Sequence, residues 1–174
     1  MNQTIQTKPE TGLALLQQIF ANPKLTGFFL TGESALSLST RGDNIEKAEI
    51  FTLSEFNAGE LAVWLTSEFE VTLVKIGNNL LEAQFEKLKV YIFRHPYKLL
   101  SQPKSIQGIE VAGQEDIAVM SIRKIITGQC LYSPELLWLK NRFSFKQLLD
   151  LYLEKYPESS ADDLEAMQNK LFFS

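Results

Sequence analysis

Two short stretches decide which fold this sequence encodes: FFLTGESALSL (residues 28–38) and EKAEIF (residues 46–51). The first opens with an apolar run typical of a buried strand, turns at Gly32 and continues with helical spacing. The second alternates charged and apolar residues, which predicts a strand with one polar face. A glycine turn before a helix lets backbone amides approach a phosphate, and carboxylates on the next strand can hold Mg²⁺ beside it. The pattern therefore suits the chemistry of metal-dependent nucleotidyl transfer.

The rest of the chain predicts an α+β layout, in which helices and strands alternate, several antiparallel strands follow and a helical tail ends the chain. Strands are expected over 27–31, 46–52, 71–76, 80–85 and 89–93, and helices over 10–21, 34–40, 57–69, 114–127, 134–140, 145–156 and 161–172. Asn57 is expected to cap its helix, and Gly128 to end another. We expect one domain, residues 1–174, with a small mixed β-sheet flanked by helices in 1–97 and a helical C-terminal region in 98–174.

Composition narrows the class of protein. The chain has 174 residues, of which 45% are hydrophobic and 22% charged, as in an average globular protein. Its net charge of −4 argues against a nucleic-acid partner. No apolar run is long enough to span a membrane, the N-terminus does not resemble a signal peptide, and the single cysteine, Cys130, cannot form an internal disulfide. We expect a cytoplasmic protein that does not contact membranes.

Searches for other catalytic motifs find nothing. The sequence has no phosphate-binding P-loop, no Gly-x-Gly-x-x-Gly, no Cys-x-x-Cys and no Gly-x-Ser-x-Gly. His95 is the single histidine, so a metal site would have to rely on carboxylates. Trp64 and Trp138 lie on apolar helical faces and are expected to pack in the core.

Several stretches resemble the AbiEii-type nucleotidyltransferase family, in the order in which the family has them. LTGESAL (30–36) is similar to the family's Leu-Thr-Gly-Gly-Thr-Ala-Leu motif, and Ile50-Phe51 matches the aromatic end of its Asp-x-Asp-Phe-Phe motif. Later matches are KVYI (89–92), EDIAVM (115–120) and KQLLDLY (146–152). The resemblance implies a nucleotidyltransferase-like fold, with residues 1–97 as its α/β core.

The departures from the family fall at its functional positions. Glu33 stands where the family has the second glycine of its first motif, and Lys47 and Tyr91 stand where it has its first and third metal carboxylates. Ser121 replaces a helix lysine of the family, and Gln147 replaces a helix aspartate. The family's histidine and arginine before the carboxylate strand match Gly42 and Asp43. Glu49 is the one carboxylate that survives. Two Mg²⁺ ions need about three carboxylates, so the resemblance implies a fold retained without its metal ligands.

The leading hypothesis is a degenerate nucleotidyltransferase-fold protein that has lost metal-dependent transfer, needs no cofactor and acts as a binding or regulatory module. Lys47 could then bind a phosphate directly, with Gly32 and Ser34 as further nucleotide-binding residues. The expected partners are a nucleotide or a protein encoded in the same operon.

The alternative hypothesis is an active, Mg²⁺-dependent nucleotidyltransferase of the toxin type. It would move a nucleotide from a nucleoside triphosphate to an RNA or protein hydroxyl, with Glu49 as its catalytic metal ligand. A shifted register would add Asp43 and Glu46 to the candidate ligands.

Overall fold

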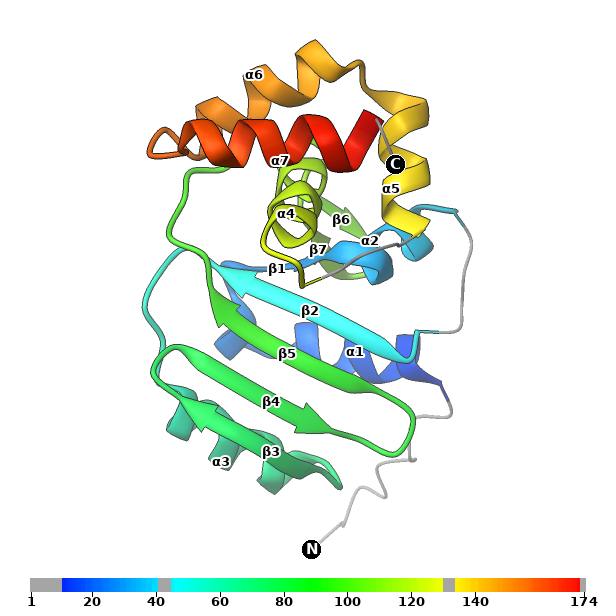
Figure 1. Ribbon diagram of the computed structural model, residues 1–174. Coiled ribbons are helices and arrows are strands. Elements are labelled where there is room, and N and C mark those ends of the chain that lie inside the picture. Colours follow the sequence, from blue (N-terminus) through cyan, green and yellow to red (C-terminus); the bar gives the residue numbers. More distant parts are fainter. Residues whose placement is uncertain (1–10, 41–44, 130–133, 173–174) are drawn as a thin grey trace, which may run out of the picture.

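In the computed structural model, which describes residues 11–40, 45–129 and 134–172, one seven-stranded sheet runs through the molecule (Figure 1). Its strands are β1 (Phe28–Thr31), β2 (Lys47–Thr52), β3 (Thr72–Gly77), β4 (Leu80–Gln84), β5 (Lys89–Arg94), β6 (Lys104–Ile106) and β7 (Ile109–Val111). They are ordered β3-β4-β5-β2-β1-β7-β6. The pairs β2–β5 and β1–β7 are parallel and the other neighbours are antiparallel. The predicted mixed sheet is confirmed.

The helices are α1 (Gly12–Phe20), α2 (Gly32–Thr40), α3 (Ala58–Glu68), α4 (Gln114–Ile126), α5 (Pro134–Arg142), α6 (Phe145–Lys155) and α7 (Ala161–Phe172), with a short 3₁₀ helix at Pro23–Leu25. The side chain of Asn57 accepts hydrogen bonds from the backbone N–H groups of Gly59 and Glu60, as its predicted capping role requires. Gly128 follows α4 with a φ of +74°. Each predicted helix is present, and α2 begins two residues earlier than expected, at Gly32.

One hairpin was not predicted. Strands β6 and β7 are joined by Gln107 and Gly108, whose φ angles are +53° and +81°, as in the two-residue turns that connect tightly twisted strands. Through β7 the hairpin extends the sheet beyond β1. The hairpin belongs to residues 98–174, so this part of the chain contributes strands as well as helices. The division of the domain at residue 97 stays a prediction.

The two faces of the sheet differ in what covers them. Ala48 and Ile50 of β2, with Val90 and Ile92 of β5, are fully buried in the core that includes α3 residues. Because side chains alternate along a strand, the odd-numbered residues from Lys47 onward point to the other face. Figure 1 shows α1 and α3 behind β3, β4, β5 and β2, whereas no helix of the described ranges lies in front of β3, β4 and β5. We call this front side the open face.

A second apolar cluster joins helices α4 to α7. It contains Ala118, Val119, Ile122 and Ile125 of α4, whereas Ile117 and Met120 of the same helix belong to the sheet's core. Helix α4 therefore connects the sheet to the C-terminal helices, which confirms the predicted helical C-terminal part. None of the helices in the described ranges has the length and apolar character needed to cross a membrane.

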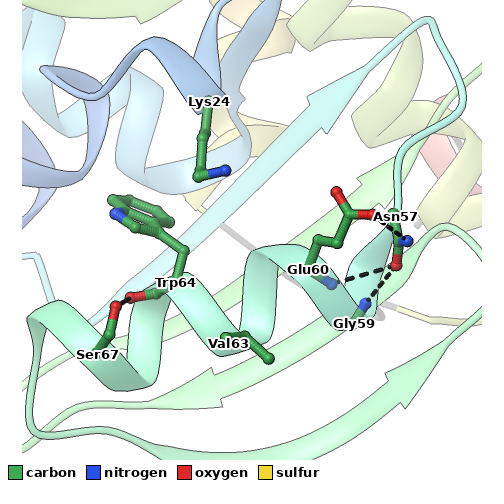
Figure 2. Close-up of a pocket in the computed structure, with 7 residues that line it drawn as sticks. All are labelled: Lys24, Asn57, Gly59, Glu60, Val63, Trp64 and Ser67. Atoms are coloured by element: carbon green, nitrogen blue, oxygen red, sulfur yellow. Dashed lines mark hydrogen bonds between the residues drawn. The ribbon is translucent and has the colours of Figure 1, made fainter.

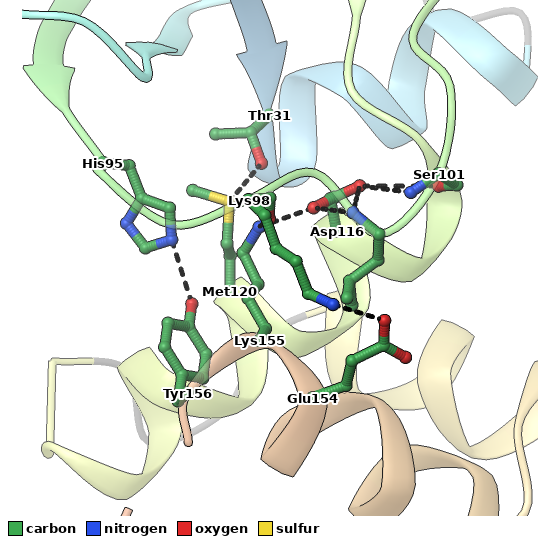
Figure 3. A network of polar contacts seen from close by, with 10 residues as sticks. Thr31, His95, Lys98, Ser101, Asp116, Met120, Glu154, Lys155 and Tyr156 are labelled. Carbon is green, nitrogen blue, oxygen red and sulfur yellow. Dashed lines mark hydrogen bonds and ion pairs between the residues drawn. The ribbon is translucent and has the colours of Figure 1, made fainter. Parts of the chain in front are cut away.

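A buried ion pair fixes α4 against α6 (Figure 3). Lys155 Nζ lies 2.5 Å from Asp116 Oδ1, and both side chains are fully buried. Lys155 also donates to the carbonyl oxygen of Lys98, and Asp116 accepts from the backbone N–H groups of Leu100 and Ser101. Each charge thus has partners beyond the ion pair itself, as a buried pair requires.

We predict that Asp116→Asn lowers the free energy of unfolding by about 3–5 kcal/mol, because it leaves the Lys155 ammonium buried without its counter-charge. Urea unfolding followed by circular dichroism measures this change. The matched control is Lys98→Met, which removes an exposed ion pair with Glu154. That control is expected to cost less than about 1 kcal/mol. Equal losses in the two variants would contradict the structural role of the buried pair.

Candidate functional site

The strand register brings the candidate residues of β2 and β5 together at the centre of the sheet, beside β1. Thr31 of β1 is paired with Glu49 of β2, and Glu49 is paired in parallel register with Tyr91 of β5. Lys47 lies two residues before Glu49 and therefore on the same face. Three positions that the sequence resemblance assigned to metal carboxylates are thus neighbours, and they hold a lysine, a glutamate and a tyrosine.

Both carboxylate oxygens of Glu49 are already paired with lysines. Lys47 Nζ lies 2.8 Å from Oε1, and Lys124 Nζ forms an ion pair with Oε2. The Glu49 side chain is 16% exposed. Burial raises the pKa of Glu49, but the charge and hydrogen bond of Lys124, with those of Lys47, outweigh burial and leave the pKa below its ordinary value. Glu49 is therefore an ionised carboxylate held between two ammonium groups.

Lys124 was missed as a partner of Glu49 in the sequence analysis. It lies in the last turn of α4, three residues after Ser121, which is buried. Residues three apart on a helix are neighbours on one face. The sequence signal was that Ser121 replaces the family's helix lysine and that Lys124 follows it one helical turn later. The contact between Lys124 and Glu49 itself joins residues 75 apart in sequence.

Tyr91 lies beneath two ammonium groups. Lys47 Nζ is 5.2 Å and Lys89 Nζ 4.7 Å from the centre of its ring, both within the range of a cation–π contact. Lys89 Nζ also lies 3.9 Å from a carboxylate oxygen of Glu82, the β4 residue that is paired with Tyr91. Lys89 is a second residue that the sequence analysis did not single out.

The glycine turn leads directly into α2, and its polar groups have the following positions. Gly32 has a φ of +70°, a conformation that favours glycine. The Ser34 hydroxyl is buried and donates to the carbonyl oxygen of Thr31 at 3.1 Å. Glu33 is exposed in the first turn of α2. The helix thus presents a carboxylate at this end, and its serine hydroxyl is used within the chain.

The other sequence candidates lie elsewhere. Gln147 is part of the capping box of α6, where its side chain accepts from the backbone N–H of Ser144. Trp64 packs in the sheet's core, and Trp138 packs against both clusters. Gly42, Asp43 and Cys130 fall outside the described residues.

The residues at the centre of the sheet do not fit a Mg²⁺ site. In the described ranges, no three histidine, cysteine, aspartate or glutamate side chains come together as a metal-binding group. Mg²⁺ is held by carboxylates in near-octahedral geometry. Here the one central carboxylate is paired with two cations, and its strand neighbours are Thr31 and Tyr91.

His95 follows β5 and belongs to an aromatic cluster beside the site (Figure 3). Its Nε2 atom lies 3.1 Å from the Tyr156 hydroxyl, and its ring contacts Phe51, Tyr97 and Tyr156. Burial, with the nearby charges of Lys155 and Arg123, lowers the pKa of His95 to about 4. His95 is therefore neutral at neutral pH and has a packing role in this structure.

A surface hollow lies over α3 (Figure 2). Because α3 lies behind the sheet and Glu49 belongs to the open face, the hollow and Glu49 are on opposite sides of the sheet. Its lining comes from Lys24 and the α3 segment, including Gly59, Val63 and Ser67. Trp64 also lines it, but the Trp64 Nε1 atom is buried and has no hydrogen-bond partner among the described residues. The hollow shares no residue with the site around Glu49.

We predict that Lys124→Met lowers the free energy of unfolding at pH 7 by about 1 kcal/mol, because Glu49 loses its least exposed counter-charge. A depressed carboxylate pKa adds stability above the unfolded value of 4.5, and this stability is lost as pH falls through the folded value. The difference between wild type and variant should therefore shrink below about pH 4.5. Urea titrations from pH 7 to pH 3 measure it, with the exposed Lys24→Met as the charge-matched control.

For His95 we predict a second pH dependence. Its folded pKa of about 4 lies below the unfolded value of 6.5, so between these values the unfolded chain binds a proton that the folded chain does not. Stability should fall by up to about 1.4 kcal/mol per pH unit as pH drops through this window. His95→Gln should remove this slope in urea titrations. An unchanged slope in the variant would show that another group is responsible.

Comparisons with known proteins identify the fold. No family model matches the sequence, and no curated protein matches it. The crystal structure of JHP933 from Helicobacter pylori has a TM-score of 0.53 and 14% identity, and the match covers 91% of this chain and 90% of that one. A further H. pylori crystal structure, described provisionally as a nucleotidyltransferase, has a TM-score of 0.52 and 14% identity, with 89% of this chain and 92% of that one covered. At this identity the likeness concerns the fold alone, and the chain has a nucleotidyltransferase-like fold.

Proposed function

We propose that this protein is a degenerate relative of the AbiEii-type nucleotidyltransferases that binds its ligand without metal-dependent nucleotidyl transfer. Its role is that of a binding or regulatory module, with a nucleotide as the ligand that the fold suggests. The order of the sequence motifs between residues 28 and 152 supports the relationship to the family. The nucleotidyltransferase-like fold supports the location of the ligand site on the open face.

One observation carries the proposal: both oxygens of Glu49 are paired with lysine ammonium groups. A divalent cation would have to displace two ammonium groups from the carboxylate and then remain beside them. Repulsion between like charges a few ångströms apart costs several kcal/mol in a partly buried site. The two positions paired with Glu49 on the neighbouring strands offer no second carboxylate as compensation, because they hold Thr31 and Tyr91.

The same arrangement supports binding. Lys47 and Lys124 supply fixed positive charge where a metalloenzyme would use an exchangeable ion, and Lys47 is 58% exposed and can reach a ligand. Fixed ammonium groups hold phosphate oxygens but do not bring an attacking hydroxyl and a phosphorus atom into line as two metal ions do. Binding without transfer follows from this difference.

The test is a transfer assay with each of the four α-³²P nucleoside triphosphates, in Mg²⁺ and in Mn²⁺, with bulk RNA or protein as acceptor. We expect no labelled acceptor from wild type above the level found with Glu49→Gln. The comparison with Glu49→Gln removes contaminating activity, since a contaminant labels acceptors equally in both preparations. Transfer by wild type that Glu49→Gln abolishes would overturn the proposal and identify an active, metal-dependent enzyme.

A further inference from the structure

Three lysines from separate strands and a helix converge on the open face. Lys47 Nζ contacts both Glu49 and the ring of Tyr91, and Lys124 Nζ pairs with the other oxygen of Glu49. Lys89 Nζ lies 4.7 Å from the centre of the same ring. We call Lys47, Lys89 and Lys124 the lysine cluster. Tyr91 and Glu49, paired across β2 and β5, form its floor.

The lysine cluster is locally cationic in an acidic chain. The protein carries a net charge of −4, yet three ammonium groups gather here around the carboxylate of Glu49, with the carboxylate of Glu82 beside Lys89. The contact between Lys89 and Glu82 is long, at 3.9 Å, and Lys89 is 37% exposed. A concentration of one sign of charge on a face raises the local concentration of ligands of the opposite sign. The face therefore attracts anions although the whole chain repels them.

We propose that the lysine cluster binds the polyphosphate group of a ligand in its metal-free form and that Mg²⁺ antagonises this binding. This inference rests on the proposed function, since it concerns binding at the same site. The phosphate oxygens take the Lys47 and Lys89 ammonium groups, and a phosphate oxygen competes with Glu49 for Lys47. Lys124, which is 21% exposed, stays paired with Glu49 and offsets its charge.

The antagonism follows from charge. A free triphosphate group carries about four negative charges at neutral pH, and a chelated Mg²⁺ ion removes two of them and covers oxygens that the lysines would contact. The bound cation would also lie beside three ammonium groups. In a metal-dependent site Mg²⁺ strengthens phosphate binding instead, because there the ion links phosphate to protein carboxylates.

The effect of Glu49→Gln on polyphosphate affinity distinguishes a lysine-based site from a metal-dependent one. Glu49→Gln removes the carboxylate that competes with phosphate for Lys47 and that repels an anion. Polyphosphate binding should then tighten about tenfold, the effect of one charge-assisted hydrogen bond. The same substitution would abolish binding at a site that uses Glu49 as a metal ligand.

The experiment is a calorimetric titration of the full chain with inorganic tripolyphosphate and with ATP, each in EDTA and in excess Mg²⁺. We expect binding in EDTA that Mg²⁺ weakens about tenfold or more. Equal affinity for the two ligands shows that the phosphates alone are recognised, and tighter binding of ATP shows that the nucleoside adds contacts. Lys47→Met and Lys89→Met should each weaken binding about tenfold.

Lys24→Met is the control, because it removes an exposed lysine that lies at the α3 hollow, on the other side of the sheet (Figure 2). It should leave affinity unchanged, and thermal melts show whether each variant is folded. Binding that requires Mg²⁺, binding that the cluster substitutions leave unchanged, or no binding of either ligand would overturn this inference. If the cluster substitutions leave binding unchanged, the proposed function stands, whereas no binding of either ligand also counts against a nucleotide as its ligand. The transfer assay tests the loss of nucleotidyl transfer separately, so the two failures are distinguishable.

Discussion

The charge of the site depends on where helix α4 sits, and two ion pairs at its two ends fix that position. Asp116 in the first turn is bound to Lys155 of α6, and Lys124 in the last turn is bound to Glu49 in the sheet. Between these ion pairs, α4 contributes apolar residues both to the sheet's core and to the second apolar cluster, which joins α4 to α7. A shift of α4 along its axis would separate Lys124 from Glu49 and leave a carboxylate of low exposure with one counter-charge fewer.

A partly buried carboxylate at the centre of a sheet needs opposite charge, and a protein can supply it in two ways. Divalent ions exchange with the solvent and can take part in a reaction, whereas lysine side chains are a permanent part of the chain. This chain supplies Lys47 and Lys124. We propose that these lysines take the place of a metal ion and that the positive charge of this surface attracts an anion. The fold shared with the H. pylori structures does not distinguish these outcomes, because function depends on the side chains at the site.

Much of the fold could be predicted from the sequence, because its elements have strong local signals. The alternation in residues 46–52, the cap at Asn57 and the glycine after α4 each identified an element that the structure contains. The β6–β7 hairpin was missed because its strands have three residues each, too few for alternation to be recognised, and its turn is Gln-Gly rather than Asn-Gly.

The site was predictable only where it depends on strand alternation. The shared face of Lys47 and Glu49 follows from their spacing of two. The pairing of Glu49 with Tyr91 and with Lys124 depends on strand order and helix packing, which are tertiary features without a local signal. The direction of the Ser34 hydroxyl likewise has no local signal in the sequence, since a serine at this position could equally have faced a ligand.

We propose that the lysines neutralise Glu49 and that Glu49 is not a metal ligand. Electron paramagnetic resonance of free Mn²⁺, titrated with wild type and with Glu49→Gln, tests it without any assumption about the ligand or the reaction. We expect the two proteins to leave the same free Mn²⁺ signal at every concentration. A stoichiometric loss of signal with wild type that is absent with Glu49→Gln would contradict it.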